Sequence, residues 1–298
     1  MPARRLRLNV PLDLARTLGP CVRGPGDPTM RLTRTRAWRA TRTTEGPAAI
    51  AIEHRPGEVV AEAWGAGADR VLADLPALLG LDDDPSALVP AHPLVAELAR
   101  RMPGLRIGRT GAVLEALVPA ILEQKVTGSE AYRAFRGLVR TFGEPAPGPL
   151  GLSLPPTPAR LAALPYHAFH PLGVERRRAD TVRRAAARTA RVEEAAALAP
   201  AVATERLTSL PGVGAWTAAE VVARALGDPD AVSVGDFHLP SLVAWALAGE
   251  PRADDARMLE LLEPYRGQRG RVIRLLEASG LAAPRYGPRM APRSIAGM

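Results

Sequence analysis

Two features of the chain have residue types and spacing suited to chemistry: a glycine-rich turn and a single acid about twenty residues beyond it. The turn reads Leu210-Pro211-Gly212-Val213-Gly214, and a helix is predicted to follow at once, over residues 214–227. Gly212 and Gly214 can adopt positive φ angles and let another backbone come close. The free amide groups of a helix start, together with the helix dipole, bind anions such as phosphate.

The acid is Asp236, in the stretch Val234-Gly235-Asp236-Phe237-His238. An aspartate just before a helix is most often its N-cap. Beside a phosphate-binding turn, the same carboxylate can stabilise the positive charge that develops on a sugar when its bond to a base breaks, and can orient a water molecule. We therefore expect Asp236 to be catalytic. His238 is expected to orient a phosphate or water, with a structural histidine of the helix as the alternative.

The turn followed by Asp236 resembles the hairpin and catalytic acid of the helix-hairpin-helix (HhH-GPD) DNA glycosylases. Three more segments resemble the AlkA-type DNA-3-methyladenine glycosylase II group of that family: residues 115–127, 172–179 and 264–270. The resemblance spans most of residues 10–280. It implies a monofunctional DNA glycosylase that hydrolyses the N-glycosidic bond of alkylated purines, such as 3-methyladenine and 7-methylguanine, in duplex DNA during base excision repair.

The residue at position 216 separates subtypes of this family. Members that also cleave the DNA strand carry a lysine there, which attacks the sugar as an amine nucleophile. Trp216 cannot do so, and the resemblance therefore implies an N-glycosylase without lyase activity. A tryptophan can stack on an electron-poor alkylated base, or it can simply pack in the core. Tyr166 and Phe169 are expected to line the base pocket with it.

The same resemblance implies which residues touch duplex DNA, the expected partner. Lys125 stands at the position of the residue that fills the gap left by a flipped nucleotide; the alternative is an exposed lysine at a helix end. Arg206 and Arg224 would add phosphate contacts or remain solvated surface charges. The residues expected to contact DNA are Gln124, Lys125, Thr127, Leu210, Gly212, Val213, Gly214, Ala215, Thr217 and His238.

A monovalent cation (Na⁺ or K⁺) on the backbone carbonyls of Thr208, Leu210 and Val213 is a further implication of the resemblance, and no other cofactor is expected to be required. His167 and His170 have a spacing that suits a metal. No third ligand is evident, so packing within a loop is the preferred interpretation.

Two features near the acid depart from the family pattern. Gly235 stands where the family generally has a second acid, and Phe237-His238 after Asp236 is closer to other branches of the family. Together they leave the preferred base open, so a glycosylase of the same fold for another damaged base, such as a deaminated purine, is one alternative. Gly235 and Lys125 keep a second alternative, a DNA-binding protein that recognises lesions without cleaving. The family also usually has a small residue where this chain has Glu123.

Composition sets the broad class of protein. The 298 residues carry a net charge of +8, which favours a polyanionic partner, although a basic protein without a nucleic-acid role has a similar charge. Cys21 is the only cysteine, which excludes an intrachain disulfide and a cysteine-based iron–sulfur site. No secretory signal or membrane-spanning run is evident. We expect a cytoplasmic, nucleoid-associated monomer without contact to membranes.

Hydrophobic patterning predicts an α+β N-terminal domain (residues 1–85, an antiparallel sheet with helices) followed by a mostly α-helical HhH-GPD core (residues 86–284, two helical subdomains with the DNA and base cleft between them). Residues 285–298 form a basic tail that we expect to be disordered. Strands are predicted at residues 30–35, 48–54 and 58–64, and helices at residues 12–18 and 69–79.

The second part of the chain has helical periodicity and no convincing strand. Residues 112–126 are predicted to be a helix bent at Pro119. Thr127 and Glu130 can form a capping box for a helix that ends near Gly143. Residues 144–158 are rich in proline and glycine and are predicted to be a loop. Asp82, Asp83 and Asp84 are expected to form a solvated linker, and Asp254 and Asp255 a helix cap. Later helices are predicted at residues 175–190, 204–210, 214–227, 237–248, 254–263 and 267–279.

Overall fold

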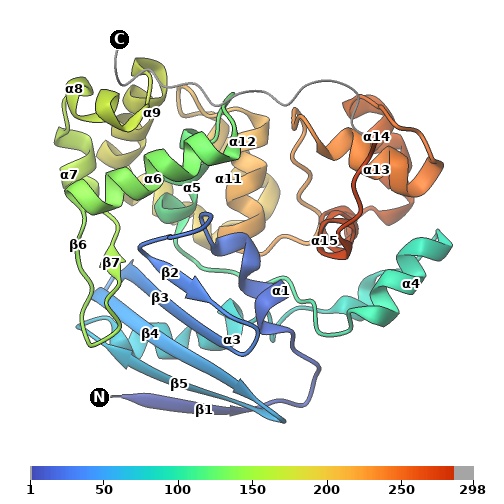
Figure 1. The fold of residues 1–298 in the computed structure, drawn as a ribbon, viewed down its shortest axis with the longest axis horizontal. Coiled ribbons are helices and arrows are strands. Elements are labelled where there is room, and N and C mark those ends of the chain that lie inside the picture. The colour runs from blue at the N-terminus through green and yellow to red at the C-terminus, as the bar shows by residue number, and fades with distance from the viewer. Residues whose placement is uncertain (1, 285–298) are drawn as a thin grey trace.

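The structure is a computed structural model that describes residues 2–284, so the predicted tail at residues 285–298 lies outside the described residues. Its N-terminal part is a five-stranded antiparallel sheet, and the rest is almost entirely helical (Figure 1). This is the fold class predicted from the sequence. In spatial order, the strands of the sheet are β1 (Ala3–Arg7), β5 (Glu58–Trp64), β4 (Gly46–Arg55), β3 (Arg36–Thr43) and β2 (Met30–Leu32).

The helical elements follow from the N-terminus to residue 279. The α-helices are α1 (Leu14–Leu18), α2 (Ala68–Ala73), α3 (Leu75–Leu78), α4 (Pro93–Arg101), α5 (Val113–Leu122), α6 (Gly128–Phe142), α7 (Pro158–Ala163), α8 (Tyr166–Phe169), α9 (Arg176–Ala187), α10 (Thr189–Glu193), α11 (Pro200–Thr208), α12 (Ala215–Val221), α13 (Leu239–Ala248), α14 (Asp255–Leu262) and α15 (Arg269–Ser279). Short 3₁₀ helices are η1 (Gly19–Cys21), η2 (Pro85–Ala87), η3 (His170–Leu172), η4 (Glu194–Ala197) and η6 (Glu263–Tyr265), and η5 (Val222–Leu226) is a π-helix.

Strands β1 and β3 were not predicted. Both contain several arginines, and their apolar residues are mostly small, so the alternation of apolar and polar residues is weak. In β3, the side of the strand that carries Ala37 is nevertheless buried. The predicted helix at residues 69–79 is two short helices, α2 and α3, which meet at Asp74. Pro76 favours a new helix start. Proline has no N–H to donate, and only in the first turn of a helix does the N–H have no partner within the helix.

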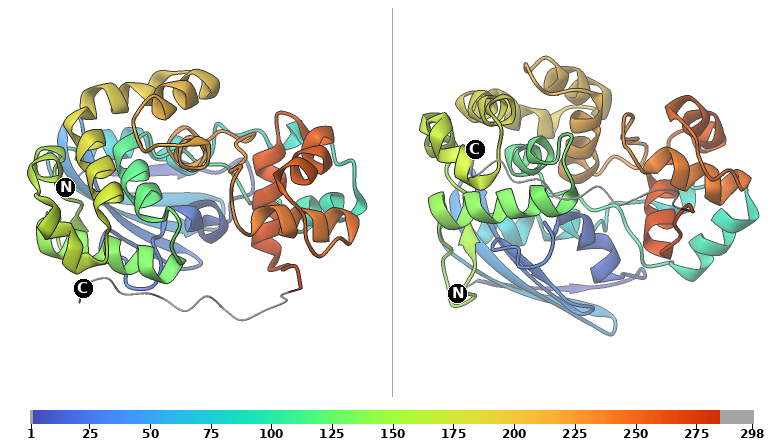
Figure 2. Two further views of the ribbon diagram at one scale, coloured as in Figure 1. Left: turned by 90° about the horizontal axis from the view of Figure 1, so that it is seen from above. Right: turned by 45° about the horizontal axis from the view of Figure 1, so that its top comes forward.

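Three large hydrophobic cores and one small cluster organise residues 2–284. The first lies between the sheet and α1, α2 and α3. The second joins α5, α6, α9, α11 and α12. The third joins α4 with α13, α14 and α15 (Figure 2), although α4 precedes α13 by more than a hundred residues. The segment after the sheet therefore contributes to the C-terminal helical group before the chain returns to the middle group.

The segment from residue 112 to residue 158 differs from its prediction at two places. Helix α5 continues through Pro119 but ends at Leu122, and residues 123–126 form a turn in which Lys125 has a φ of 55°. Residues 144–158, predicted to be a loop, contain a small hairpin of β6 (Glu144–Pro145) and β7 (Ser153–Leu154). The Ser153 amide donates to the Pro28 carbonyl at 2.8 Å, and Leu152 and Leu154 pack with Ala40 of the sheet. These contacts fix the segment on the N-terminal sheet.

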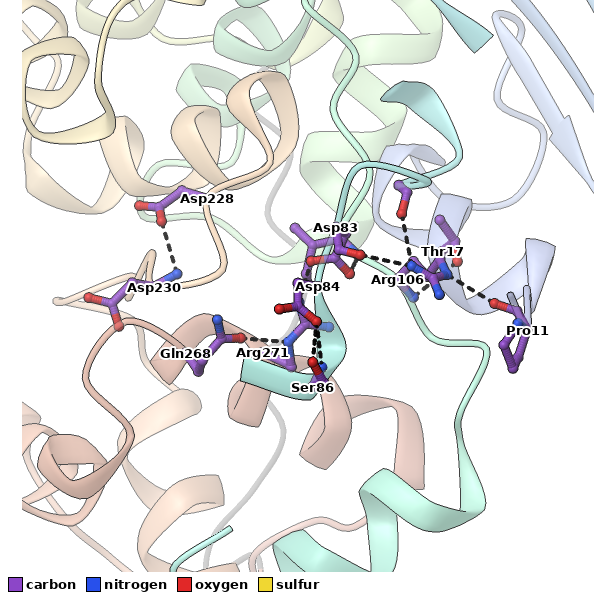
Figure 3. A network of polar contacts seen from close by, with 12 residues as sticks. Pro11, Thr17, Asp83, Asp84, Ser86, Arg106, Asp228, Asp230, Gln268 and Arg271 are labelled. Atoms are coloured by element: carbon purple, nitrogen blue, oxygen red, sulfur yellow. Dashed lines mark hydrogen bonds and ion pairs between the residues drawn. The ribbon is translucent and has the colours of Figure 1, made fainter. Parts of the chain in front are cut away.

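Asp83 is not solvated as predicted, whereas Asp82 and Asp84 are exposed. The Asp83 carboxylate is buried, accepts from the Ile107 amide at 3.0 Å and forms an ion pair with the buried guanidinium of Arg271 on α15 (Figure 3). Asp84 accepts from the Ser86 amide at 2.9 Å and caps η2. Arg106 donates to the carbonyls of Pro11 and Asp83, both at 2.9 Å. Asp83 thus joins the segment after the sheet unit to the C-terminal helices.

Within residues 2–284, none of the helices combines the length and the apolar character needed to cross a membrane.

Candidate active site and nucleic-acid interface

The predicted turn lies between α11 and α12, and residues 208–217 are called the hairpin below. The Val213 amide donates to the Leu210 carbonyl at 3.0 Å and closes the turn. Gly212 has a φ of +95°, and a Cβ there would overlap the Thr181 hydroxyl, so only glycine fits. Gly214 does not have the predicted positive φ. It is extended, with a φ of −102°, and nothing lies within 4 Å of where its Cβ would stand.

The start of α12 is open to solvent. Gly214 and Ala215 are exposed, and their helix has no side-chain cap among the described residues. The side chains of Leu210, Val213 and Thr217 are buried, so these residues can meet DNA only through their backbones. The hairpin therefore presents free amides at a helix start, which is the geometry of an anion site.

The turn after α5 packs against the hairpin. The Gln124 side-chain amide donates to the Gly212 carbonyl at 3.0 Å and to the Thr217 hydroxyl at 2.9 Å, so it joins the two segments instead of pointing outward. Lys125 is exposed at the tip of this turn. The Thr127 amide donates to the Glu130 carboxylate at 2.8 Å, which confirms the predicted capping box at the start of α6. Lys125 is the residue of this turn that is free to extend into solvent.

Asp236 is both a helix cap and a neighbour of the hairpin. Its Oδ1 accepts from the amides of His238 at 2.7 Å and Leu239 at 2.9 Å, at the start of α13. Its Oδ2 accepts from the indole Nε1 of Trp216 at 3.1 Å. Asp236 and Trp216 are half-buried. The carboxylate is thus fixed from two sides, and one of its donors is the hairpin residue expected to meet the base.

The loop that carries Asp236 is held by hydrogen bonds to Asp255 that the sequence does not indicate. Gly235 has a φ of +91°, a conformation that strains residues with a Cβ. Its amide donates to both carboxylate oxygens of Asp255, at 3.1 and 3.0 Å. Asp255 is therefore not a cap of α14; Asp254 alone has that role, accepting from the Arg257 amide at 2.9 Å. A carboxylate from α14 thus lies beside the position where the family has a second acid.

Phe237 and His238 follow Asp236 at the surface. Phe237 is 82% exposed, an unusual exposure for a large apolar side chain, and its ring meets the His238 ring edge-on at 4.9 Å. His238 is also exposed. Both rings are accessible beside Asp236.

Four charged side chains lie behind the hairpin. Glu220 pairs with Arg224 and accepts from the Ser233 hydroxyl at 2.5 Å, and Glu123 faces Arg23 at 3.5 Å. Burial would raise the pKa of Glu220, but Arg224 and the Ser233 hydrogen bond hold that pKa below its usual value. Arg224 also donates to the Pro20 carbonyl at 3.0 Å, so it is a structural residue and not a surface phosphate contact. Arg206 remains at the surface, paired with Glu194.

Two residues predicted for the base pocket lie elsewhere. Phe169 is fully buried in the middle hydrophobic core and has no free surface. Tyr166 lies under the Arg176 guanidinium at 4.7 Å and meets the His170 ring at 5.8 Å. Both belong to α8, at the opposite end of the helical region from α13 (Figure 1). The aromatic residues of one short segment were predicted to face the base, whereas the fold uses them for packing.

No group of three or more potential metal-ligating side chains occurs in residues 2–284, His167 and His170 included. The carbonyls of Thr208, Leu210 and Val213 all belong to the hairpin, and that of Leu210 already accepts from the Val213 amide. A monovalent cation on these three carbonyls stays a prediction.

Comparison with known proteins supports the resemblance seen in the sequence. No family model matches the chain. A curated relative from Mycobacterium tuberculosis, named "Probable bifunctional transcriptional activator/DNA repair enzyme AlkA", is 34% identical over 172 residues. The match covers 54% of this chain but only 34% of that relative, so the two share about a third of the relative's length.

Solved structures match over nearly the whole chain. A 3-methyladenine DNA-glycosylase from Archaeoglobus fulgidus has a TM-score of 0.77 at 20% identity, covering 93% of this chain and 98% of its own. The 8-oxoguanine glycosylase/lyase from Clostridium acetobutylicum has a TM-score of 0.71 at 15% identity, covering 93% and 96%. The chain therefore has the fold of these glycosylases, and over 172 residues it is similar in sequence to the relative named AlkA.

Proposed function

We propose that the protein is a monofunctional DNA glycosylase that hydrolyses the N-glycosidic bond of alkylated purines in duplex DNA, as a step of base excision repair. One observation carries the proposal: the carboxylate of Asp236 is fixed by Trp216 of the hairpin and by the first amides of α13. The phosphate-binding segment and the acid are thereby joined through a single hydrogen bond.

The geometry suits hydrolysis at a sugar carbon. The exposed amides of Gly214 and Ala215 would hold a phosphate of the damaged strand, and Lys125 would enter the minor groove. The damaged nucleotide would flip toward Trp216. As its bond to the sugar breaks, Asp236 stabilises the positive charge on the sugar and takes the proton of the attacking water. A base that already carries a positive charge leaves as a neutral molecule, so this step needs no acid.

The residue at position 216 supports the absence of lyase activity. Trp216 stands where strand-cleaving members of the family have a lysine, and its indole nitrogen donates to Asp236. Lys125 is the only lysine in the sequence, and it lies on the turn after α5 and not on α12. An amine nucleophile is therefore missing from the place where the lyase chemistry needs it.

The names of the similar proteins support alkylated purines as the substrate class. The structure with the higher TM-score of the two compared carries a name that refers to 3-methyladenine, and the curated relative is named AlkA. The other solved structure is named for 8-oxoguanine, so the test must include that base. We also expect the protein to act as a monomer and in the compartment that holds the DNA.

The test is release of free base from defined duplexes. We expect 3-methyladenine and 7-methylguanine to be released from methylated duplex DNA, leaving an abasic strand that is cut only after alkali treatment, with no protein–DNA adduct on borohydride reduction. Release of 8-oxoguanine with strand cleavage, or a borohydride adduct, would contradict the proposal. Tight binding to an abasic-analogue duplex without release of any base would indicate a lesion-binding protein.

A further inference from the structure

We propose that Glu220 is a positioning residue for base release: it holds Ser233, and through Ser233 it fixes the turn that ends at Asp236. This inference rests on the proposed function and deepens it. Glu220 lies on α12, one helical turn beyond Trp216, and only 15% of its side chain is exposed. It is a largely buried acid that the hydrolysis step itself does not use.

Helix α12 holds the turn of residues 233–236 at both ends. Trp216 and Glu220 are four residues apart, so their side chains lie on the same face of the helix. The Trp216 indole donates to Asp236 Oδ2 at 3.1 Å, and the Ser233 hydroxyl donates to Glu220 Oε1 at 2.5 Å. The Asp236 amide donates to the Ser233 carbonyl at 3.2 Å and closes the turn. The acid and the start of its turn are therefore both tied to one helix.

Glu220 is itself held in place from the N-terminal side of the molecule. Its second oxygen, Oε2, accepts from Arg224 at 2.5 Å. Arg224 also donates to the carbonyls of Glu220 and Pro20, each at 3.0 Å. Pro20 belongs to η1, which directly follows α1 of the sheet unit. A line of hydrogen bonds thus runs from the sheet unit through Arg224 and Glu220 to the turn that carries the acid.

The contact between Ser233 and Glu220 has the features of a strong hydrogen bond. Burial raises the pKa of Glu220, but Arg224 and the Ser233 hydroxyl hold that pKa below its usual value, so the acceptor is a carboxylate. Hydrogen bonds to a charged acceptor are shorter and stronger than those between neutral groups. Ser233 is buried, so its hydroxyl would lose its partner if the turn moved away. The contact therefore favours one position of Ser233.

The turn needs such outside contacts to place the acid. Two residues separate Ser233 from Asp236, and one of them is Gly235, with a φ of +91°. Because glycine restricts the backbone least, the turn does not define its own conformation. Asp255 holds the Gly235 amide from α14, and Glu220 holds Ser233 from α12. Since a small misplacement of a catalytic group lowers the rate strongly, loss of the Ser233 contact should slow base release without weakening DNA binding.

The test variant is Ser233→Ala, which removes the hydroxyl and leaves the ion pair between Glu220 and Arg224 intact. Truncating Glu220 itself would leave the largely buried Arg224 without its partner. The matched control is Thr41→Val: the Thr41 hydroxyl is also buried and donates at 2.8 Å to Glu115, a carboxylate paired with an arginine, but it lies on β3. We expect single-turnover release of 7-methylguanine to be about 10-fold slower in Ser233→Ala and near the wild-type rate in Thr41→Val. Both variants should bind an abasic-analogue duplex as tightly as the wild-type protein.

The Asp236→Asn background gives a readout that a purely structural role of Ser233 would not move. If Ser233 acts through the Asp236 carboxylate, Ser233→Ala should cause no further slowing once that carboxylate is replaced. Equal slowing in both backgrounds would overturn the inference. Release by Ser233→Ala at the wild-type rate, or an equal loss in Thr41→Val, would also overturn it and show that Glu220 is only the ion-pair partner of Arg224. These outcomes leave the proposed function standing, whereas a wild-type protein that releases no base from any defined duplex overturns both.

Discussion

Gly212 and Gly214 lie two residues apart in the hairpin, but they differ in backbone conformation and in the space around them. At Gly212, the positive φ and the nearby Thr181 hydroxyl exclude a side chain. At Gly214, the backbone is extended and the space around it is empty of protein atoms. The first glycine is explained by the fold itself, whereas the second leaves room for a ligand to approach.

Alanine at these two positions should therefore separate stability from DNA binding. We expect Gly214→Ala to melt at or slightly above the wild-type temperature, because Ala tolerates an extended backbone and restricts the unfolded chain by about 0.4–1 kcal/mol. It should weaken binding to an abasic-analogue duplex, since the new methyl group occupies the space for phosphate. Gly212→Ala should lower the melting temperature. Thermal melts and fluorescence anisotropy measure both, and wild-type affinity of Gly214→Ala would refute a phosphate contact at the hairpin.

The residues of the candidate site were predictable to different degrees. The hairpin and Asp236 each belong to a short motif, and their spacing in the sequence predicted that they lie beside each other, as the Trp216–Asp236 hydrogen bond shows. Glu123 was visible as a departure from the family, but its charged neighbours Arg23 and Arg224 come from distant segments. The contact between Gly235 and Asp255 spans twenty residues, and no local pattern signals such a contact.

At the scale of elements, the loop before α13 depends on α14. The Gly235 amide is held by both oxygens of Asp255, and the next residue is Asp236. Glycine is the conformationally most permissive residue, so this contact fixes the loop that carries the acid in one conformation. The loop at Gly235, where the family has a second acid, is thus held by a carboxylate from the neighbouring helix α14.

Asp254 and Asp255 provide a matched pair for testing this support. Asp255→Ala should reduce the rate of base release about 10-fold, because a small misplacement of a catalytic group lowers the rate strongly. Asp254→Ala removes only the N-cap of α14 and should lower the free energy of unfolding by about 1 kcal/mol while base release stays near the wild-type rate. Single-turnover kinetics and chemical denaturation measure the two effects. Equal loss of base release in both variants would show that α14 acts only through its stability.

The elements themselves were predicted where periodicity was strong. The α6 helix had both an apolar stripe and a capping box, and its predicted ends agree with the structure. The end of α5 was misplaced, because residues 123–126 continue the helical composition while tertiary contacts of Gln124 favour a turn. Strand β3 and the β6–β7 hairpin are held by contacts with other segments, which sequence periodicity does not report.

At the scale of the whole molecule, the ion pair between Asp83 and Arg271 joins distant parts. Asp83 follows the N-terminal sheet unit, and Arg271 belongs to α15. Their side chains are only 7% and 2% exposed, so removing one partner leaves a buried charge without compensation. No local pattern in the sequence indicates this pair, because its two residues lie 188 positions apart.

Asp83→Asn should therefore lower the free energy of unfolding by about 3 kcal/mol. Asp82→Asn is the control: Asp82 pairs with Arg109, but both side chains are more than half exposed, so its loss should change the free energy by less than about 1 kcal/mol. Urea denaturation of both variants checks the difference. Equal stability of the two variants would mean that the buried pair does not hold the C-terminal helices to the sheet unit.

If the Asp236 carboxylate performs hydrolysis at a DNA sugar, its loss should stop base release and leave DNA binding intact. Release of 7-methylguanine from methylated duplex DNA is measured for the wild-type protein and for Asp236→Asn. The substituted side chain keeps an oxygen that can accept from the amides of His238 and Leu239, so α13 should remain capped. We expect release by the wild-type protein, at least about a 100-fold slower release by the variant, and equal binding of both to an abasic-analogue duplex. Release by Asp236→Asn at the wild-type rate would show that this carboxylate is not the catalytic group.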